Sequence, residues 1–326
     1  MNFRLMRCLM RYVPSLALIL LIWVPSAAQK SDTNKFAVII NGPGGEPAYA
    51  KQFTEWTTDL SSVLSQRYGF DAKQIKVLSD KLATAEEVQR TFTSLKSELD
   101  ANNVLFVFFI GHGSFDGKDA KFNLVGPDLS ASDYNQLLTA LPTKRVVIFN
   151  MSSASGEFVK PLSAKGRIVV TATRNGQETN ATRFAGFFIN ALTATDGDTD
   201  QDGHTSVLEA FVYANRLTEE FYKRAGRLAT EHALLDDNGD GVGREKPEAG
   251  EGLLARATYL DSLSVDEAAA SAATGRLLKE RARLEGEIEQ LIARKSNMAE
   301  AEYEATLERL FIELAKVNRS IKQAGT

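Results

Sequence analysis

Two short polar segments each follow an apolar run of the kind that forms a buried strand. GHGSFDG follows VLFVFFI, and NMSSASG, further along, follows RVVIF. The first segment carries His112 between two glycines, and the second carries Ser152 and Ser153. Histidine titrates near neutral pH and can act as a general base, while a serine hydroxyl becomes a nucleophile when a base takes its proton. Taken alone, His112 is more typical of a hydrogen-bonded turn, so acyl-transfer chemistry requires that the two segments meet.

A third segment, DTDQDGHTSVLE, has the spacing of an EF-hand calcium loop. Calcium takes six to eight oxygen ligands at about 2.3–2.6 Å, supplied at alternating loop positions and by a glutamate at position 12. The predicted ligands are Asp198, Asp200, Asp202, the backbone carbonyl of His204, and Glu209, with Gly203 at the sharp turn. We therefore expect a bound Ca²⁺ ion. The alternative is an acidic turn that caps the following helix.

A weaker second loop repeats the first half of this pattern. Asp236, Asn238 and Asp240 occupy positions 1, 3 and 5, and Gly241 occupies position 6. Position 12 is Pro247, which has no ligating side chain. The second loop is either an incomplete site or one closed from elsewhere, by Glu245, Glu248 or a backbone carbonyl. The alternative is a solvated loop of Asx turns.

The elements that must position these residues follow from the hydrophobic pattern. Apolar runs alternate with amphipathic stretches from Lys35 to about Ala194, which is typical of a parallel sheet with helices on both faces. Functional residues gather at the carboxyl ends of the strands in such sheets. The expected strands are 36–40, a run near Ile75, 104–110, 145–150 and 167–173. The expected helices are 48–68, 83–99 with Thr84 as its cap, YNQLLTALP, 183–192 and 206–230, followed by LLDDNGDGVGREKPEAGEG as loop.

The order and spacing of FVFFIGHGSFDG and VVIFNMSSASG resemble the caspase–legumain clan of cysteine peptidases (clan CD), and most closely the legumain-type peptidase family C13. The resemblance covers roughly Lys35 to Gly241, and we assign 35–250 to a caspase/legumain-like domain. It implies a caspase-like three-layer sandwich, with α/β architecture and a mostly parallel sheet. It also implies His112 as the catalytic histidine, Ser152 at the nucleophile position, Asn150 as a supporting residue, and Gly113 as an oxyanion-hole amide shared with the turn at Ser152 and Ser153.

The chain departs from this family at the nucleophile. The family uses cysteine, and the single cysteine of this sequence is Cys8, near the N-terminus. Legumain-type members also carry an asparagine that orients the histidine. In NGPGGEP the candidate for it is Asn41, and the alternative is a glycine at that position. We therefore expect a pseudopeptidase that binds a peptide or protein partner in a calcium-stabilised fold. The alternatives are an active hydrolase using His112 with Ser152 or Ser153, and a purely structural assembly module.

The N-terminal residues predict secretion. Arg4, Arg7 and Arg11 precede a short apolar run that ends in small residues at 26–28, which is typical of a signal peptide spanning 1–28. We expect a secreted or periplasmic protein with no stable membrane span after cleavage. The alternative is an uncleaved N-terminal anchor. The formal net charge of −4, with no basic block, disfavours nucleic-acid binding.

The C-terminal segment 264–326 has two apolar seams with alternating four- and three-residue spacing. The first seam runs from Leu277 to Met298, the second from Tyr303 to Ile321, and Asn297 with Glu300 resembles a capping box between them. We expect a coiled-coil-like antiparallel helical hairpin, with one long dimerising helix as the alternative. The seam needs a partner, which is the same chain, the main domain or another protein.

Overall fold

The structure is a computed structural model, and it describes residues 34–199, 204–247, 251–260 and 276–324, the last range without 278–279, 282, 285–286, 289–290, 292–293 and 296–297. The predicted signal peptide lies outside the described residues, as do two calcium-loop aspartates, Asp200 and Asp202, and also Gly203 and Glu248. Asn297, expected to cap the last helix, also falls outside them.

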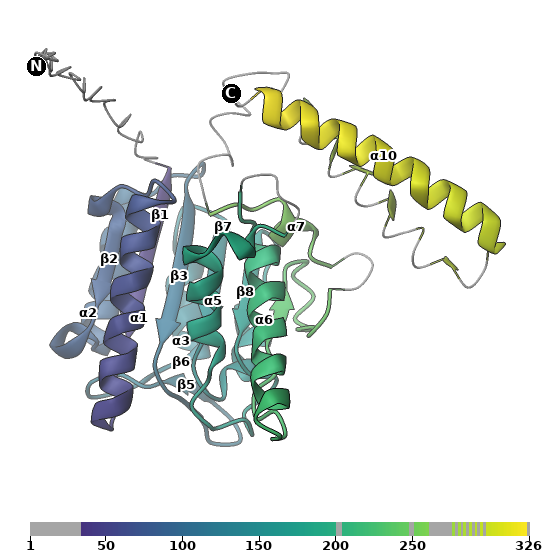
Figure 1. Ribbon diagram of the computed structural model, residues 1–326. Helices are drawn as coiled ribbons and strands as arrows, with labels where there is room; N and C mark the ends of the chain where they lie inside the picture. Colours follow the sequence, from purple (N-terminus) through teal and green to yellow (C-terminus); the bar gives the residue numbers. More distant parts are fainter. Residues whose placement is uncertain are drawn as a thin grey trace, which may run out of the picture. The chain divides into compact units, whose positions relative to one another are not determined.

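A six-stranded sheet in the order β2-β1-β3-β7-β8-β9 forms the centre of the fold (Figure 1). The first five strands run parallel, and β9 pairs antiparallel with β8 at the edge. The strands of this sheet are β1 (Lys35–Asn41), β2 (Ile75–Leu78), β3 (Val104–Ile110), β7 (Arg145–Asn150), β8 (Arg167–Thr171) and β9 (Leu234–Asp236). The predicted, mostly parallel α/β sheet is confirmed.

Helices cover both faces of this sheet and make it the middle of three layers. The α-helices are α1 (Pro47–Gln66), α2 (Ala85–Glu98), α3 (Ala131–Thr139), α4 (Val159–Leu162), α5 (Phe184–Thr193), α6 (Val207–Arg224), α7 (Leu253–Arg256) and α10 (Glu300–Ala324). Short 3₁₀ turns lie at Ala72–Gln74, Asp80–Leu82, Ser155–Phe158 and Thr195–Gly197. Side chains alternate between the faces of β1, so Ala37 and Ile39 join the core beneath α1, α5 and α6, whereas Val38 and Ile40 join the core beneath α2 and α3.

The predicted strands and helices match the structure closely, with two corrections. The helix expected over 206–230 ends at Arg224, because the chain turns at Gly226, whose φ of +61° favours glycine. The segment expected to be loop begins with β9, a short strand that ends at Asp236. Thr84 caps α2 as expected, accepting a hydrogen bond from the Glu87 amide at 3.2 Å.

A small antiparallel sheet was missed by the sequence reasoning. Its strands are β4 (Gly113–Phe115), β5 (Ala120–Phe122) and β6 (Leu129–Ser130), in that spatial order. β4 begins directly after His112, and the Asn123 amide donates to the His112 carbonyl at 3.0 Å. This sheet therefore fixes the backbone on the carboxyl side of the histidine.

The C-terminal region forms a helical pair with a core of its own. The described residues between 276 and 291 are helical, residues 298 and 299 are not, and α10 follows. Leu284, Ile288 and Leu291 form one buried cluster with Tyr303 and Leu310 of α10. Thus the two predicted seams pack against each other. Across the part of the chain that the structure describes, no helix is both long and apolar enough to span a membrane.

Candidate functional site

The two polar segments meet at the carboxyl edge of the central sheet. β3 pairs in parallel with β7, and Phe109 lies opposite Asn150, so that His112 and Ser152 follow neighbouring strand ends. A Cβ atom added to Gly113 would lie 2.4 Å from the Ser153 carbonyl oxygen and 2.8 Å from Ser152 Oγ. The backbone after the histidine therefore touches the serine turn, and only glycine fits there.

His112 is held by a backbone carbonyl and by aromatic rings. Its Nε2 lies 3.2 Å from the Gly44 carbonyl oxygen, and its ring meets Tyr49 and Phe53 edge-on, with centroids 5.3 and 5.1 Å apart. A carbonyl oxygen only accepts hydrogen bonds, so Nε2 carries the proton of the neutral ring. When the ring is neutral, this contact leaves the lone pair on Nδ1, which is then the nitrogen able to act as a base.

The group that orients His112 is Gly44, in the turn where the sequence left Asn41 or a glycine open for this role. Asn41, the candidate for that role, ends β1 with its Oδ1 buried and without a hydrogen-bond partner, whereas Gly44 supplies the bond to His112. A backbone carbonyl is common to every residue type, so the sequence holds no side-chain signal for it. The Gly- and Pro-rich turn after β1 was the only available hint.

Ser152 is fully buried, with 0% of its surface exposed. Its hydroxyl donates to Asn150 Oδ1 at 2.6 Å, and its backbone amide reaches the same oxygen at 3.2 Å. Asn150 was predicted to support this residue, and it does contact it directly. Within the described part of the chain, no hydrogen bond joins the His112 ring to Ser152 or Ser153.

The Ser153 hydroxyl accepts a hydrogen bond from the amide that was expected to form an oxyanion hole. The Gly113 amide donates to Ser153 Oγ at 3.1 Å, and that hydroxyl lies 3.1 Å from the Gly113 carbonyl oxygen, to which it donates. An oxyanion hole requires N–H groups aimed at the position where negative charge develops. In this structure, the amides of both Gly113 and Ser152 are directed at side-chain oxygens of the protein itself.

The serine turn lies beneath the segment 173–183, which follows β8. Thr182 Oγ1 donates to the Met151 carbonyl at 2.6 Å, and the Ala154 amide donates to the Glu178 carbonyl at 2.8 Å. Ala154 has a φ of +53°, an uncommon conformation for a residue with a side chain. These bonds hold the turn in a tight shape and help to explain why Ser152 is inaccessible.

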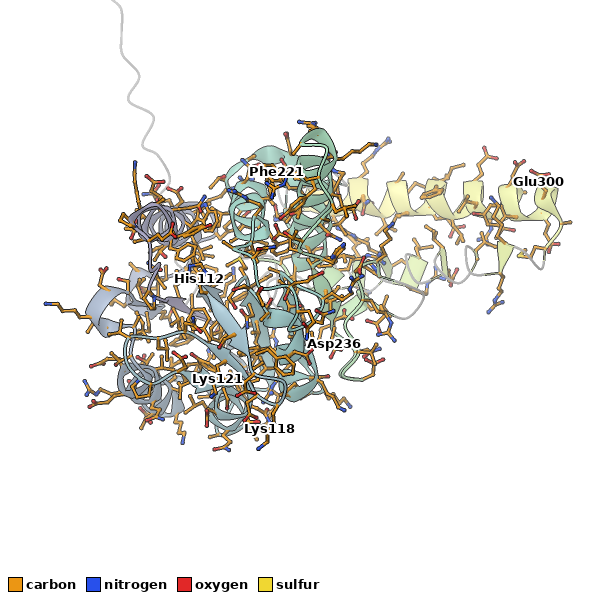
Figure 2. All side chains as sticks on the ribbon, turned by 90° about the horizontal axis from the view of Figure 1, so that it is seen from below. His112, Lys118, Lys121, Phe221, Asp236 and Glu300 are labelled. Atoms are coloured by element: carbon orange, nitrogen blue, oxygen red, sulfur yellow. The ribbon has the colours of Figure 1, made fainter. Side chains whose placement is uncertain are left out.

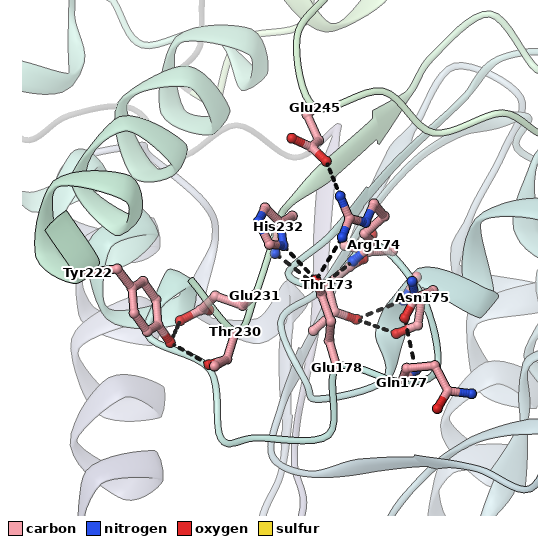
Figure 3. Close-up of polar contacts among 12 residues, drawn as sticks. Thr173, Arg174, Asn175, Gln177, Glu178, Tyr222, Thr230, Glu231, His232 and Glu245 are labelled. Atoms are coloured by element: carbon pink, nitrogen blue, oxygen red, sulfur yellow. Dashed lines mark hydrogen bonds and ion pairs between the residues drawn. The ribbon is translucent and has the colours of Figure 1, made fainter. Parts of the chain in front are cut away.

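Two glutamates anchor this covering segment (Figure 3). Glu178 accepts hydrogen bonds from the backbone amides of Arg174 and His232 at 2.8 and 3.0 Å, and His232 Nδ1 lies 2.5 Å from its other carboxylate oxygen. Thus His232 forms part of the anchor. Arg174 also pairs with Glu245 at 3.3 Å.

The second anchor is Glu231, which holds the end of the covering segment. Its carboxylate accepts the amides of Arg183 and Phe184, at 2.8 and 3.1 Å, and the Tyr222 hydroxyl, at 2.9 Å. Burial raises the pKa of Glu231 above its ordinary value, although the surrounding amide donors stabilise its charged form. The covering segment is therefore tied at its middle and at its end to residues 231 and 232, which follow α6.

The first predicted calcium loop is only partly described. Glu209 accepts the backbone amides of Thr199 at 3.0 Å and Ser206 at 2.9 Å, and the latter bond forms a capping box at the start of α6. Asp198 and His204 precede this helix, and the His204 ring lies edge-on to Tyr259. Among the residues that the structure describes, no three carboxylate, imidazole or thiol side chains form a ready-made metal group.

The second acidic loop gathers Asp236, Asn238 and Asp240 beside Glu251, which the sequence reasoning missed. Asn238 Nδ2 contacts a Glu251 carboxylate oxygen and lies 3.3 Å from Asp240 Oδ2. Burial raises the pKa of Glu251 to about 7, in spite of the neighbouring Arg244. Glu245, proposed to close this loop, pairs with Arg174 instead.

Comparison with solved structures returns distant likenesses. Protein GSU0716 from Geobacter sulfurreducens is 12% identical, with a TM-score of 0.43, and the match covers 62% of this chain and 92% of that one. Caspase-1 from Spodoptera frugiperda is also 12% identical, with a TM-score of 0.44, over 64% of this chain and 88% of the other. No curated protein sequence matches the chain.

The sequence model of the caspase domain gives the decisive comparison. It matches residues 36–310, well over half of the 326 residues, and the match includes both strand ends described above. With its histidine and serine segments on neighbouring parallel strands, the chain belongs to the caspase domain family.

Proposed function

We propose that this protein is a secreted caspase-domain pseudopeptidase, which binds a peptide or protein partner without cleaving it. The observation that carries the proposal is the state of Ser152 at the nucleophile position. Its hydroxyl is buried and donates to Asn150, and it makes no hydrogen bond to His112. The finer likeness to legumain-type peptidases stays a prediction.

The exchange of sulfur for oxygen supports the proposal on chemical grounds. A cysteine near neutral pH is partly ionised already, whereas a serine needs a base held in hydrogen-bond contact and oriented by a third group. Here the third group is present, since Gly44 orients His112, but the contact between base and hydroxyl is not. Loss of a nucleophile in a catalytic unit lowers turnover by about 10⁴–10⁶-fold.

The internal hydrogen bonds at the oxyanion position support the same conclusion. A substrate carbonyl would have to displace Ser153 Oγ from the Gly113 amide, and Asn150 Oδ1 from the Ser152 amide. Each displacement removes a hydrogen bond that the folded protein already makes. A partner at this edge of the sheet would therefore contact the surface around the half-buried His112. Its carbonyl carbon would not be attacked by Ser152.

Calcium and secretion complete the proposal. In support of calcium, Glu209, at position 12 of the loop pattern, lies in the first turn of α6, where the last ligand of an EF-hand loop is expected. A calcium ion bound by Asp198, Asp200, Asp202, the His204 carbonyl and Glu209 would tie the start of α6 to the preceding loop. The arginines and apolar run of residues 1–28 support export from the cell.

The test is a pair of assays on the purified mature chain with calcium present. In the first, peptide libraries are incubated with the protein, and binding and cleavage are measured separately. We expect binding without turnover, and binding that is reduced in a His112→Ala variant. Turnover that disappears in Ser152→Ala or Ser153→Ala would contradict the proposal.

The second assay addresses the hydrolase alternative directly. A serine-directed phosphonate labels a serine only when a base activates it, so we expect no labelling of Ser152 or Ser153. Labelling that is lost in His112→Ala would establish an active serine hydrolase instead. A chain that neither binds peptides nor reacts with the phosphonate would favour the structural module.

A further inference from the structure

The second acidic loop, at the edge of the sheet, is closed at its base by backbone hydrogen bonds. Asp236, labelled in Figure 2, is the last residue of β9, and the residue before it exchanges two hydrogen bonds of 2.9 Å with Arg244. The chain between them turns at Gly239 and Gly241, which have φ values of +78° and +77°. The Gly241 amide is fixed to Ser163 Oγ at 2.9 Å. These hydrogen bonds hold the loop in a defined conformation.

The guanidinium of Arg244 occupies the middle of this loop. It contacts a Glu251 carboxylate oxygen, the Val242 carbonyl oxygen at 2.9 Å, and Asp240 Oδ2 at 3.0 Å. Val242 stands at position 7 and Asp240 at position 5 of the calcium-loop pattern. The positive side chain thus touches the oxygens that a bound cation would use.

Two carboxylate oxygens in this loop are buried without a hydrogen-bond partner. They are Oδ2 of Asp236, a residue that is 1% exposed, and Oε2 of Glu251, which is 3% exposed. A buried carboxylate oxygen with no donor is costly, because that atom has lost water and gained no hydrogen bond in exchange. A cation that all these oxygens shared would satisfy both atoms.

Asp237 explains why Glu251, far from position 12, reaches the loop. Its two carboxylate oxygens accept the backbone amides of Gly252, at 2.8 Å, and Ala255, at 2.9 Å. These bonds fix the start of α7 beside the loop and bring the preceding residue, Glu251, over Asn238. The glutamate that position 12 lacks is supplied from this neighbouring turn.

We propose that the second acidic loop is a calcium site, closed by Glu251, in which Arg244 holds the place of the ion in the metal-free protein. The ligands are side-chain oxygens of Asp236, Asn238, Asp240 and Glu251, with the Val242 carbonyl. An all-oxygen set with several carboxylates suits a hard divalent cation, and an irregular loop of this kind suits calcium better than magnesium. Binding requires that the guanidinium swing out of its contacts with Glu251 and Asp240.

The test is a calcium titration of the full mature chain, stripped with chelator, by calorimetry. An Asp200→Asn background removes the first loop, so that the remaining binding reports on this one. We expect one calcium ion per chain in this background, and its loss in Glu251→Gln. Arg244→Gln is expected to tighten calcium binding by about tenfold, because the competing charge-assisted hydrogen bonds are gone.

A matched control is Glu245→Gln, since Glu245 lies in the same segment but pairs with Arg174. It should leave the titration unchanged. Arg244→Gln also separates this proposal from a purely structural ion pair, which predicts lower thermal stability and no gain in calcium affinity. If the Asp200→Asn background binds no calcium, and Arg244→Gln does not restore binding, the site is a permanent arginine–carboxylate cluster. The result does not depend on the peptide assays, so either proposal can fail alone.

Discussion

At the scale of single residues, Gly113 sets how closely the two strand ends approach. A side chain there would collide with the Ser153 carbonyl oxygen, which is backbone and cannot move aside cheaply. We expect Gly113→Ala to lower the free energy of unfolding by about 1–3 kcal/mol, the usual cost of overpacking. Urea unfolding measures it, with the exposed neighbour Ser114→Ala as control. Equal midpoints for the two variants would mean that the turn adjusts freely.

Glu231 should make stability depend on pH. Its pKa in the folded protein lies above the ordinary value of 4.5, because it is buried. The folded state therefore binds the proton more tightly than the unfolded state does. The resulting stabilisation is fully present below pH 4.5 and is lost as the pH rises through the pKa of the folded protein. Each tenfold difference in proton affinity between the two states corresponds to about 1.4 kcal/mol.

The measurement for Glu231 is chemical unfolding between pH 4.5, the ordinary pKa of the group, and neutrality. Glu231→Gln should flatten the slope of stability against pH, because the amide does not titrate. The exposed Glu219→Gln, a matched control on α6, should keep the slope. An unchanged slope in Glu231→Gln would contradict the assignment.

Side-chain chemistry decided which site residues the sequence could reveal. His112 and Ser152 were predicted as site residues because histidine and serine are distinctive and follow apolar strands. Gly44 acts through its carbonyl, and Glu251 acts through a turn held by Asp237 rather than through loop spacing. Neither contact leaves a signal in residue types, since both depend on how distant segments pack.

At the scale of elements, α3 and α6 both begin with a capping box, so the same substitution can be compared in the two helices. Ser130 and Asp133 form a capping box on α3, and Ser206 and Glu209 form one on α6. We expect Ser130→Ala and Ser206→Ala each to cost about 1 kcal/mol in chelator. Calcium bound to Glu209 would use the carboxylate oxygens that accept hydrogen bonds from Ser206. The stability lost in Ser206→Ala should therefore be smaller when calcium is present. The cost of Ser130→Ala should not. Chemical unfolding with and without calcium measures both, and identical behaviour would argue against the first calcium loop.

The elements that the sequence predicted best are those with long, uniform patterns. β3 and β7 are continuous apolar runs buried on both faces, and their bounds agree with the prediction. The strands β4, β5, β6 and β9 have two or three residues each, too few for any periodicity to show. The end of α6 was placed too late because Ala, Leu and Thr continue beyond it, and the left-handed turn at Gly226 overrides their propensity.

At the scale of the whole molecule, the sheet and the C-terminal helical pair have separate buried clusters. The sheet buries two clusters, one on each face, and the helical pair buries a third. The third cluster draws its residues from a part of the chain that contributes nothing to the other two. We therefore expect damage to the third cluster to stay local.

Leu310 and Phe311 test this expectation because they are adjacent on α10 and differ in burial. Leu310 is 2% exposed within the cluster, while Phe311 is 51% exposed. Leu310→Ala should leave a cavity that lowers the stability of the helical pair by about 2–5 kcal/mol, enough to unfold a unit of two helices. Hydrogen exchange should then accelerate over 276–324 but not in β1, β3 and β7. Phe311→Ala should leave exchange unchanged, and in sedimentation should weaken any self-association that uses the exposed face of α10. Faster exchange throughout the sheet in Leu310→Ala would show instead that the helical pair and the sheet unfold as one unit.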